Sequence, residues 1–412
     1  MNIELIVIGD EILLGQISEG HTQWIGRQLG ELGLRLSEVR IVGDRVEMIS
    51  EAVKSAWSRA DVVILTGGLG PTPDDCTRFA ISSVLGRPLV THTSSQEKIL
   101  ERFRIRGVTP TAGWEVMAMV PEGSEVLPND HGAAPGFLII QDNRLLFVLP
   151  GVPSEMQPMF RSYVIPHLKN RRRGTFLAHT FYTAGAGEAY LAELIGPPDQ
   201  LQPAQLAYLP SIDNGVRIRV EMEGEEEMEV EAILKERLET VRHRIKDYIF
   251  AEEPQSLEEV VLKMLTEKGW RLALAESCTG GLLASRLISV PGASEVVDRG
   301  FITYSNESKM EELGVDGEII ERYGAVSEEC ARSMAEGARK YSGGEMAISI
   351  TGIAGPTGGS PTKPVGLVFI GISHPQGTEV FRHQFVGDRE ENRRRSAWAA
   401  LVHLWQILKT VP

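Results

Sequence analysis

Short apolar segments alternate with amphipathic ones over residues 1–168. Residues 3–8 and 61–65 are almost entirely apolar, as buried strands are, whereas residues 46–59 have the spacing of an amphipathic helix. Helices are also expected at 22–32, and strands at 36–42 and 145–149. This alternation predicts a parallel sheet with helices on both faces, and ligands at the carboxyl ends of its strands.

Two loops follow predicted strands at that edge. Gly9-Asp10-Glu11 is short, and residues 66–75 form a longer loop, rich in Gly, Pro and Asp. Gly67, Gly68 and Gly70 could cradle phosphates, and Asp74 with Asp75 could hold a divalent cation against them. The same composition also describes a loop without function. Glu155, in a first helical turn after residues 145–149, is by itself better explained as a dipole-complementing cap than as a catalyst.

Composition limits the class of protein. A chain of 412 residues predicts two or three domains, and three scattered cysteines exclude a disulfide framework or a Cys-rich zinc site. The net charge of −14 opposes general nucleic-acid binding, and the basic run 169–173 is interpreted as a solvated helix end or linker. No apolar run approaches the roughly 18 residues of a membrane span, and the first residues lack signal-peptide features. We expect a cytoplasmic protein.

Residues 174–250 differ in style from what precedes them. They predict strands at 175–183, 205–210 and 216–223, a short helix at 188–195 and a long charged helix at 226–248. This pattern indicates a small α+β module without a catalytic constellation. We expect it to link or dimerise the chain, and so we expect a homodimer.

Ser277 lies where an apolar strand, 271–275, turns into a helix, 282–290. Gly280 and Gly281 would let the backbone approach a ligand closely, and the first N–H groups of the helix would face an anion or oxyanion. A tight strand-to-helix turn with a Ser/Thr cap and no further function is the alternative.

A serine nucleophile needs a base. The histidines of this region lie late in the chain and away from the glycine loops, at 374, 383 and 403, so a His-based triad is poorly supported. Lys309 is in the first turn of a helix that follows a strand, 301–305, carrying Tyr304. A helix start disfavours a cation, which helps to keep the amine neutral and favours a Ser–Lys pair. From these residues alone, an ordinary surface lysine is the favoured alternative.

Two further segments of interest follow this pair in the sequence. A buried strand, 346–350, precedes a loop at 351–359, and Gly387-Asp388-Arg389 opens the last helix. Cations at positions 393–395 oppose the helix dipole, so at least one of them should have an anionic partner.

The C-terminal motifs resemble those of the CinA family. They are Glu276-Ser-Cys-Thr-Gly-Gly281, Thr303-Tyr-Ser-Asn306 with Lys309, Ile350-Thr-Gly-Ile-Ala-Gly-Pro356, Lys363-Pro-Val-Gly366 and Gly387-Asp-Arg389. The resemblance implies a nicotinamide mononucleotide deamidase that needs no cofactor. It further implies Ser277 as nucleophile, Lys309 as base, and Tyr304 and Thr351 as supporting or substrate-contacting groups of the catalytic site. Thr279, Gly280, Gly281, Gly352, Arg389 and Arg393 are the implied substrate contacts.

The N-terminal half is similar to the other CinA domain, which shares the molybdopterin-binding fold. The matching segments include 9–16, 66–75, 121–123, 127–129, 134–137 and 149–156. The resemblance implies a metal-dependent ADP-ribose pyrophosphatase, with Asp75, Glu11 and Glu155 as candidates for metal binding or water activation. The implied fold is α/β: a molybdopterin-binding-like domain at 1–170, a KH-type α+β connector at 171–252 and an α/β deamidase domain at 253–412.

Departures from the family pattern affect the first domain. Gly20-His21 replaces a usual Thr-Asn, and Trp114 and Val116 replace an Asn and a basic residue, so the pyrophosphatase could be weakened, re-specified or lost. Two other functions remain open. They are a non-catalytic protein partner in DNA uptake or repair, and a molybdopterin-binding protein, the latter resting on fold analogy alone.

Overall fold

A computed structural model describes residues 1–110, 113–171 and 174–412. These form two compact units, Met1–Phe176 with Glu223–Glu227, and Leu177–Met222 with Met228–Pro412. Of the basic run 169–173, the first three residues end helix α7 (Ile165–Arg171), and Arg172 and Arg173 lie outside the described residues. No helix in the described ranges is long and apolar enough to cross a membrane.

The first unit is built on a six-stranded sheet with the order β2-β1-β3-β8-β7-β6. Its strands are β1 Ile3–Ile8, β2 Leu36–Val42, β3 Val62–Thr66, β6 Glu125–Leu127, β7 Gly136–Gln141 and β8 Arg144–Leu149. The first four strands in this order are parallel, as predicted, but β7 runs antiparallel to β8 and β6. The strands β6 and β7 were not predicted; Asp142 and Asn143, both at positive φ, form the two-residue turn that joins β7 to β8 as an antiparallel hairpin.

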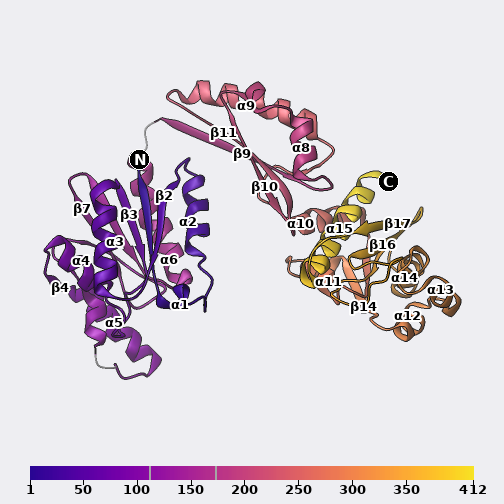
Figure 1. Ribbon diagram of the computed structural model, residues 1–412, viewed down its shortest axis with the longest axis horizontal. Helices are drawn as coiled ribbons and strands as arrows, with labels where there is room; N and C mark the ends of the chain where they lie inside the picture. Colours follow the sequence, from indigo (N-terminus) through magenta and orange to yellow (C-terminus); the bar gives the residue numbers. More distant parts are fainter. Residues whose placement is uncertain (111–112, 172–173) are drawn as a thin grey trace. The chain divides into compact units, whose positions relative to one another are not determined.

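Helices cover both faces of this sheet (Figure 1). Along β1, Ile6 and Ile8 pack into one apolar core with α3 and α4, whereas Leu5 and Val7 pack into the other with α2 and α6. Because β1, β3 and β8 are parallel neighbours, their carboxyl ends meet at the same edge of the sheet. The other elements are α1 Asp10–Leu13, α2 His21–Gly30, α3 Val46–Arg59, α4 Thr77–Leu85, α5 Thr93–Arg106, α6 Pro153–Met159, the short helices η1 Trp114–Ala118 and η2 Phe160–Val164, and the strand pair β4 Leu89–Thr91 with β5 Met119–Pro121.

The second unit begins with a four-stranded sheet of order β10-β11-β9-β12. Its strands are β9 Thr175–Thr183, β10 Gln205–Ser211, β11 Gly215–Gly224 and β12 Ile249–Ala251, with helices α8 Glu188–Ile195 and α9 Glu227–Ile245 and the short helix η3 Pro198–Leu201. Alternate residues of β11, Val216, Ile218 and Val220, are buried in a core with the two helices. This is the predicted small α+β module.

The rest of this unit contains a mixed five-stranded sheet of order β14-β13-β15-β16-β17. Its strands are β13 Leu272–Glu276, β14 Val297–Ile302, β15 Met346–Gly352, β16 Leu367–His374 and β17 Gly377–Gln384. Its helices are α10 Leu257–Lys268, α11 Leu282–Ile288, α12 Asn306–Leu313, α13 Gly317–Tyr323, α14 Glu328–Ser342, α15 Arg389–Thr410 and the short η4 Ala293–Glu295. The core with α10, α11 and α15 lies on one face, and the core with α14 lies on the other.

Two expectations for this sheet were wrong in detail. Tyr304 is not on a strand, because β14 ends at Ile302. Thr351 and Gly352 are not in a loop, since β15 continues through Gly352, where it still pairs with β16.

Candidate functional site

Ser277 follows β13 directly and lies between two strand ends. Glu276, the last residue of β13, pairs in register with Ile302 of β14 and Ile350 of β15. The Ser277 N–H donates to the carbonyl of Ile350 at 2.9 Å, which fixes the turn against β15. The residue is 8% exposed, so it is largely buried but not wholly closed to solvent.

Lys309 of α12 reaches this hydroxyl. Its Nζ lies 3.1 Å from Ser277 Oγ, 2.7 Å from the carbonyl oxygen of Thr303 and 3.3 Å from that of Ser305. The side chain is 1% exposed, and none of these partners is a carboxylate. A neutral amine can donate its two hydrogens to the carbonyls and direct its lone pair at the serine hydroxyl.

Burial lowers the pKa of Lys309, against the opposing influence of Cys330, Cys278 and Glu307. Desolvation favours the neutral amine, which is the form that can accept a proton. Burial is therefore the physical basis of the predicted neutral lysine.

The neighbouring thiols do not compete as nucleophiles. Burial raises the pKa of Cys278 to about 12 and that of Cys330 to about 11. Thiols are nucleophilic as thiolates, so these two are inert at neutral pH. The hydroxyl of Ser277 is the nucleophile that this turn offers.

Glu276 has a role that sequence reasoning missed. Its buried carboxylate accepts hydrogen bonds from the N–H groups of Gly281, Leu283 and Ala284 at 2.8–3.1 Å. The expectation that the first N–H groups of α11 face a ligand was therefore wrong, because the chain's own carboxylate occupies them. An acidic residue a few positions before a helix was the signal available in the sequence.

The turn itself retains donors. Among the described residues no acceptor is bonded to the N–H of Cys278 or of Thr279, and the buried Thr279 hydroxyl also lacks a partner. Gly280 and Gly281 have positive φ, which shapes the turn around them. The two N–H groups beside Ser277 are available to stabilise an oxyanion.

A cationic rim borders the turn. Arg389 donates to the carbonyl of Gly355 at 2.7 Å and to the Tyr304 hydroxyl at 3.0 Å, and no carboxylate pairs with it in the described part of the chain. Arg393 donates to the Thr279 carbonyl at 2.9 Å and pairs with Glu390. Tyr304 is 63% exposed, so Arg389 and Tyr304 present polar groups to solvent beside the site.

Thr351 and Gly352, the last residues of β15, make structural contacts beside the site. The buried Thr351 hydroxyl donates to the carbonyl of Ala325 at 2.7 Å, and no contact with Ser277 is found within the described ranges. A Cβ on Gly352 would lie 2.6 Å from the side chain of Val368, so close packing against β16 explains this glycine. Both residues therefore support the sheet, and their contact with a substrate stays a prediction.

The glycine-rich loop of the first unit folds upon itself. Gly67 and Gly68 have positive φ, and a Cβ on Gly68 would lie 2.1 Å from Thr77 Oγ1. A Cβ on Gly70 would lie 2.4 Å from Asp75 Oδ2. Arg78, fully buried, donates to the Leu69 carbonyl at 2.8 Å, and burial lowers its pKa to about 10. Sequence reasoning missed this buried cation, which anchors the loop.

The three carboxylates predicted to bind a metal do not converge. Asp75 Oδ2 accepts from the N–H of Thr72 at 2.9 Å and from its hydroxyl, and Glu155 Oε2 accepts from Asn129 at 2.7 Å. Glu11 instead lies near Asp44, whose pKa is raised by burial and, less strongly, by nearby acidic groups including Glu11. Within residues 1–110, 113–171 and 174–412, no three His, Cys, Asp or Glu side chains are grouped to hold a metal ion. The binding of a divalent cation by these carboxylates stays a prediction, and their arrangement in this structure does not fit a metal site.

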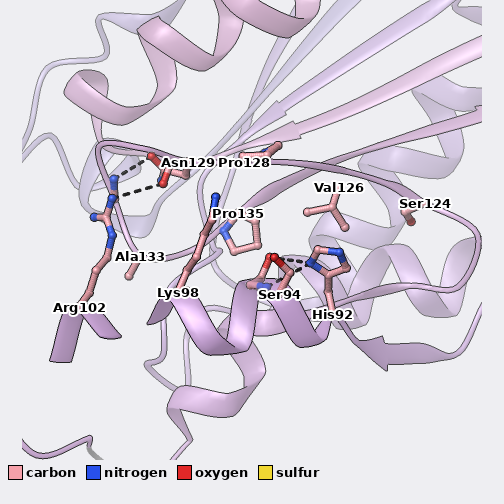
Figure 2. A pocket seen from close by; sticks show the side chains of 12 residues that line it. His92, Ser94, Lys98, Arg102, Ser124, Val126, Pro128, Asn129, Ala133 and Pro135 are labelled. Atoms are coloured by element: carbon pink, nitrogen blue, oxygen red, sulfur yellow. Dashed lines mark hydrogen bonds between the residues drawn. The ribbon is translucent and has the colours of Figure 1, made fainter. Parts of the chain in front are cut away.

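A cavity of about 270 Å³ is bounded by α5, by β6 and by residues 128–135, and its lining residue Asn129 bonds Glu155. Figure 2 shows the basic side chains His92, Lys98 and Arg102 along its α5 side. Arg102 joins α5 to the opposite wall through the carbonyls of Asn129 and Asp130. As far as the structure describes the chain, the lining includes no acidic residue. In a protein of net charge −14, such a lining favours an anionic ligand.

Three family models match successive parts of the chain. They describe a molybdopterin binding domain at residues 4–170, a damage-inducible protein CinA KH domain at 178–251 and a CinA C-terminal domain at 254–408. A competence-damage inducible protein of Caldicellulosiruptor saccharolyticus is 41% identical over 403 residues, which cover 97% of this chain and 98% of that protein. The chain belongs to the CinA family. It is thus a three-domain α/β protein with a molybdopterin-binding-like, a KH-like and a CinA C-terminal domain.

Other CinA proteins are similar over different lengths. A CinA-like protein of Dictyoglomus thermophilum is 41% identical over 374 residues, 90% of each chain. Among solved structures, a CinA superfamily protein of Escherichia coli is 35% identical, covers 37% of this chain and 88% of its own, and has a TM-score of 0.36.

Two of the residues that depart from the CinA pattern, His21 and Trp114, lie in different environments, one polar and one apolar. His21 Nδ1 is 2.9 Å from the Thr66 hydroxyl at the end of β3, and burial lowers the pKa of the imidazole. His21 therefore lies at the carboxyl end of β3. Trp114 packs edge-on against Phe103 and contacts the apolar core, so it is part of the hydrophobic packing of the first unit.

Proposed function

We propose that the C-terminal domain hydrolyses the carboxamide of nicotinamide mononucleotide to nicotinic acid mononucleotide and ammonia. Ser277 Oγ attacks the amide carbon while neutral Lys309 takes the hydroxyl proton. The tetrahedral oxyanion lies against the N–H groups of Cys278 and Thr279, which have no other acceptor among the described residues. Protonated Lys309 then gives its proton to the amide nitrogen, the C–N bond breaks, and ammonia leaves.

Water completes the reaction. Neutral Lys309 takes a proton from a water molecule, which attacks the acyl ester, and the protonated amine returns its proton to Ser277 Oγ. Arg389 supplies a guanidinium without a carboxylate partner in the described chain, suited to the phosphate of a nucleotide. The single observation that supports the proposal best is the 3.1 Å contact between the buried amine and the serine hydroxyl.

Replacing Ser277 by Ala tests the nucleophile. We expect ammonia release from nicotinamide mononucleotide to fall by roughly 10³-fold or more, because the covalent route is lost. Ser289→Ala, at an exposed serine after α11, is the matched control and should keep wild-type activity. Unchanged ammonia release in Ser277→Ala would exclude the serine mechanism, and a wild type that releases none would exclude the deamidase.

We also propose that the N-terminal domain hydrolyses the pyrophosphate of ADP-ribose. The cationic cavity bounded by α5 and β6 supports this second function, because the substrate carries two negative phosphates. The predicted requirement for a divalent cation is tested with EDTA, and no step of the reaction is assigned to a metal.

Lys98→Ala tests the cavity, since Lys98 lines it and is exposed. We expect KM for ADP-ribose to rise by about tenfold, the effect of one charge-assisted contact. Arg104→Ala on the same helix is the control, because Arg104 pairs with Glu101 and does not line the cavity. Equal KM values in the two variants would argue against the cavity as the substrate site.

A further inference from the structure

A hairpin of the KH-like domain is joined to the C-terminal domain through one carboxylate. Asp213 lies in the turn between β10 and β11, and its carboxylate accepts from Arg394 Nε at 2.9 Å and also from Arg394 Nη2. Its main-chain carbonyl accepts from Arg286 Nη2 at 2.7 Å. The guanidinium of Arg394 lowers the pKa of Asp213, so this carboxylate is ionised at neutral pH.

Packing around the turn makes the join specific. Gly215, at positive φ, lies so close to Trp398 of α15 that a Cβ there would be 2.9 Å from the indole ring. Arg286 of α11 lies over the same indole, 5.6 Å from its centroid, and pairs with Glu258 of α10 at 2.6 Å. The hairpin tip therefore contacts side chains of both α11 and α15.

Those two helices border the Ser277 turn. The helix α11 starts at Leu282, directly after the turn, and its N–H groups bond Glu276. The helix α15 carries Arg389, which meets Tyr304, and Arg393, which bonds the Thr279 carbonyl. Arg394, the partner of Asp213, follows Arg393 in the chain.

We propose that Asp213 is a positioning residue for the Ser277 site. By holding Arg394, it fixes the first turns of α15, and with them the guanidinium groups of Arg389 and Arg393 at the rim. The KH-like domain thereby sets the affinity of the C-terminal domain for an anionic substrate. The expected change in KM rests on the proposed deamidase, whereas the expected ordering of α11 and α15 by Asp213 does not.

Asp213→Asn removes the charge and leaves the main-chain carbonyl bonded to Arg286. We expect KM for nicotinamide mononucleotide to rise about fivefold with kcat within about twofold, since a partly exposed ion pair is lost and the catalytic pair is untouched. Glu221→Gln is the control, because Glu221 pairs with Arg219 on β11 rather than with α15.

A role confined to stability would lower the melting temperature without changing KM of the folded enzyme, and that result would overturn the proposal. Hydrogen exchange gives a second readout that needs no activity. Amides in residues 278–284 and 389–396 should exchange faster in Asp213→Asn than in Glu221→Gln. Equal exchange in the two variants would overturn the positioning role, whereas an inactive wild type would count against the deamidase alone.

Discussion

Lys309 combines full burial with contacts to carbonyl oxygens and a hydroxyl, and this combination determines its chemistry. A cation so placed lacks both water and a carboxylate partner, so its pKa falls. The neutral fraction of the amine rises as pH increases through this lowered pKa. We therefore expect kcat for deamidation to rise with pH and to level off once Lys309 has lost its proton.

Substitution separates a base from a phosphate contact at this residue. Lys309→Met should lower kcat by roughly 10² to 10⁴, with a smaller change in KM. Lys309→Arg should not restore activity, because a guanidinium stays protonated. Steady-state kinetics of both variants across pH decides between the roles: a loss mainly in KM, recovered by Arg, would assign Lys309 to substrate binding and leave Tyr304 as the next candidate base.

Helix α11 depends on one buried carboxylate for its first turn. Glu276→Gln replaces an acceptor of three N–H groups by an amide that directs its own hydrogens at some of them. We expect the free energy of unfolding of the second unit to fall by about 2–3 kcal/mol, as for hydrogen bonds to a charged group. Glu259→Gln, in the exposed capping box of α10, should cost less than about 1 kcal/mol in the same urea titration. Equal losses would show that burial of the Glu276 carboxylate adds nothing.

Several elements could be predicted because their signals are local. Residues 46–59 have helical spacing and form α3 with those bounds, and Ile3–Ile8 forms the apolar strand β1. The strand β7, which a two-residue turn pairs with β8, was not predicted, and the length of β15 was missed because its pairing with β16 extends it. Glu276 and Asp213 could not be assigned from the sequence, since the partners that give them roles are set by tertiary packing.

At the scale of the whole second unit, a histidine pair links the sheet to the last helix. His383 Nε2 of β17 lies 2.8 Å from His403 Nε2 of α15, and His403 stacks on Phe381. Burial, reinforced by the charge of His383, lowers the pKa of His403 to about 4 from 6.5. Because the unfolded chain binds this proton more readily, stability is retained above pH 6.5 and is lost as pH falls toward 4.

Urea titrations of wild type and His403→Gln measure this loss. Between pH 6.5 and 4 the wild type should lose about 3 kcal/mol more than the variant, the value of the pKa difference at 1.36 kcal/mol per unit. Parallel pH curves for the two proteins would show that His403 does not carry the dependence.

The buried thiols have a consequence for the chain in an oxidising cell. Cys76, Cys278 and Cys330 are all buried, and burial raises the pKa of each thiol. Peroxide oxidises thiolates to sulfenic and sulfinic acids, whereas a serine hydroxyl does not undergo this oxidation. The proposed amide hydrolase, with Ser277 and Lys309 as its catalytic pair, should keep its activity at peroxide concentrations that inactivate cysteine-dependent amidases.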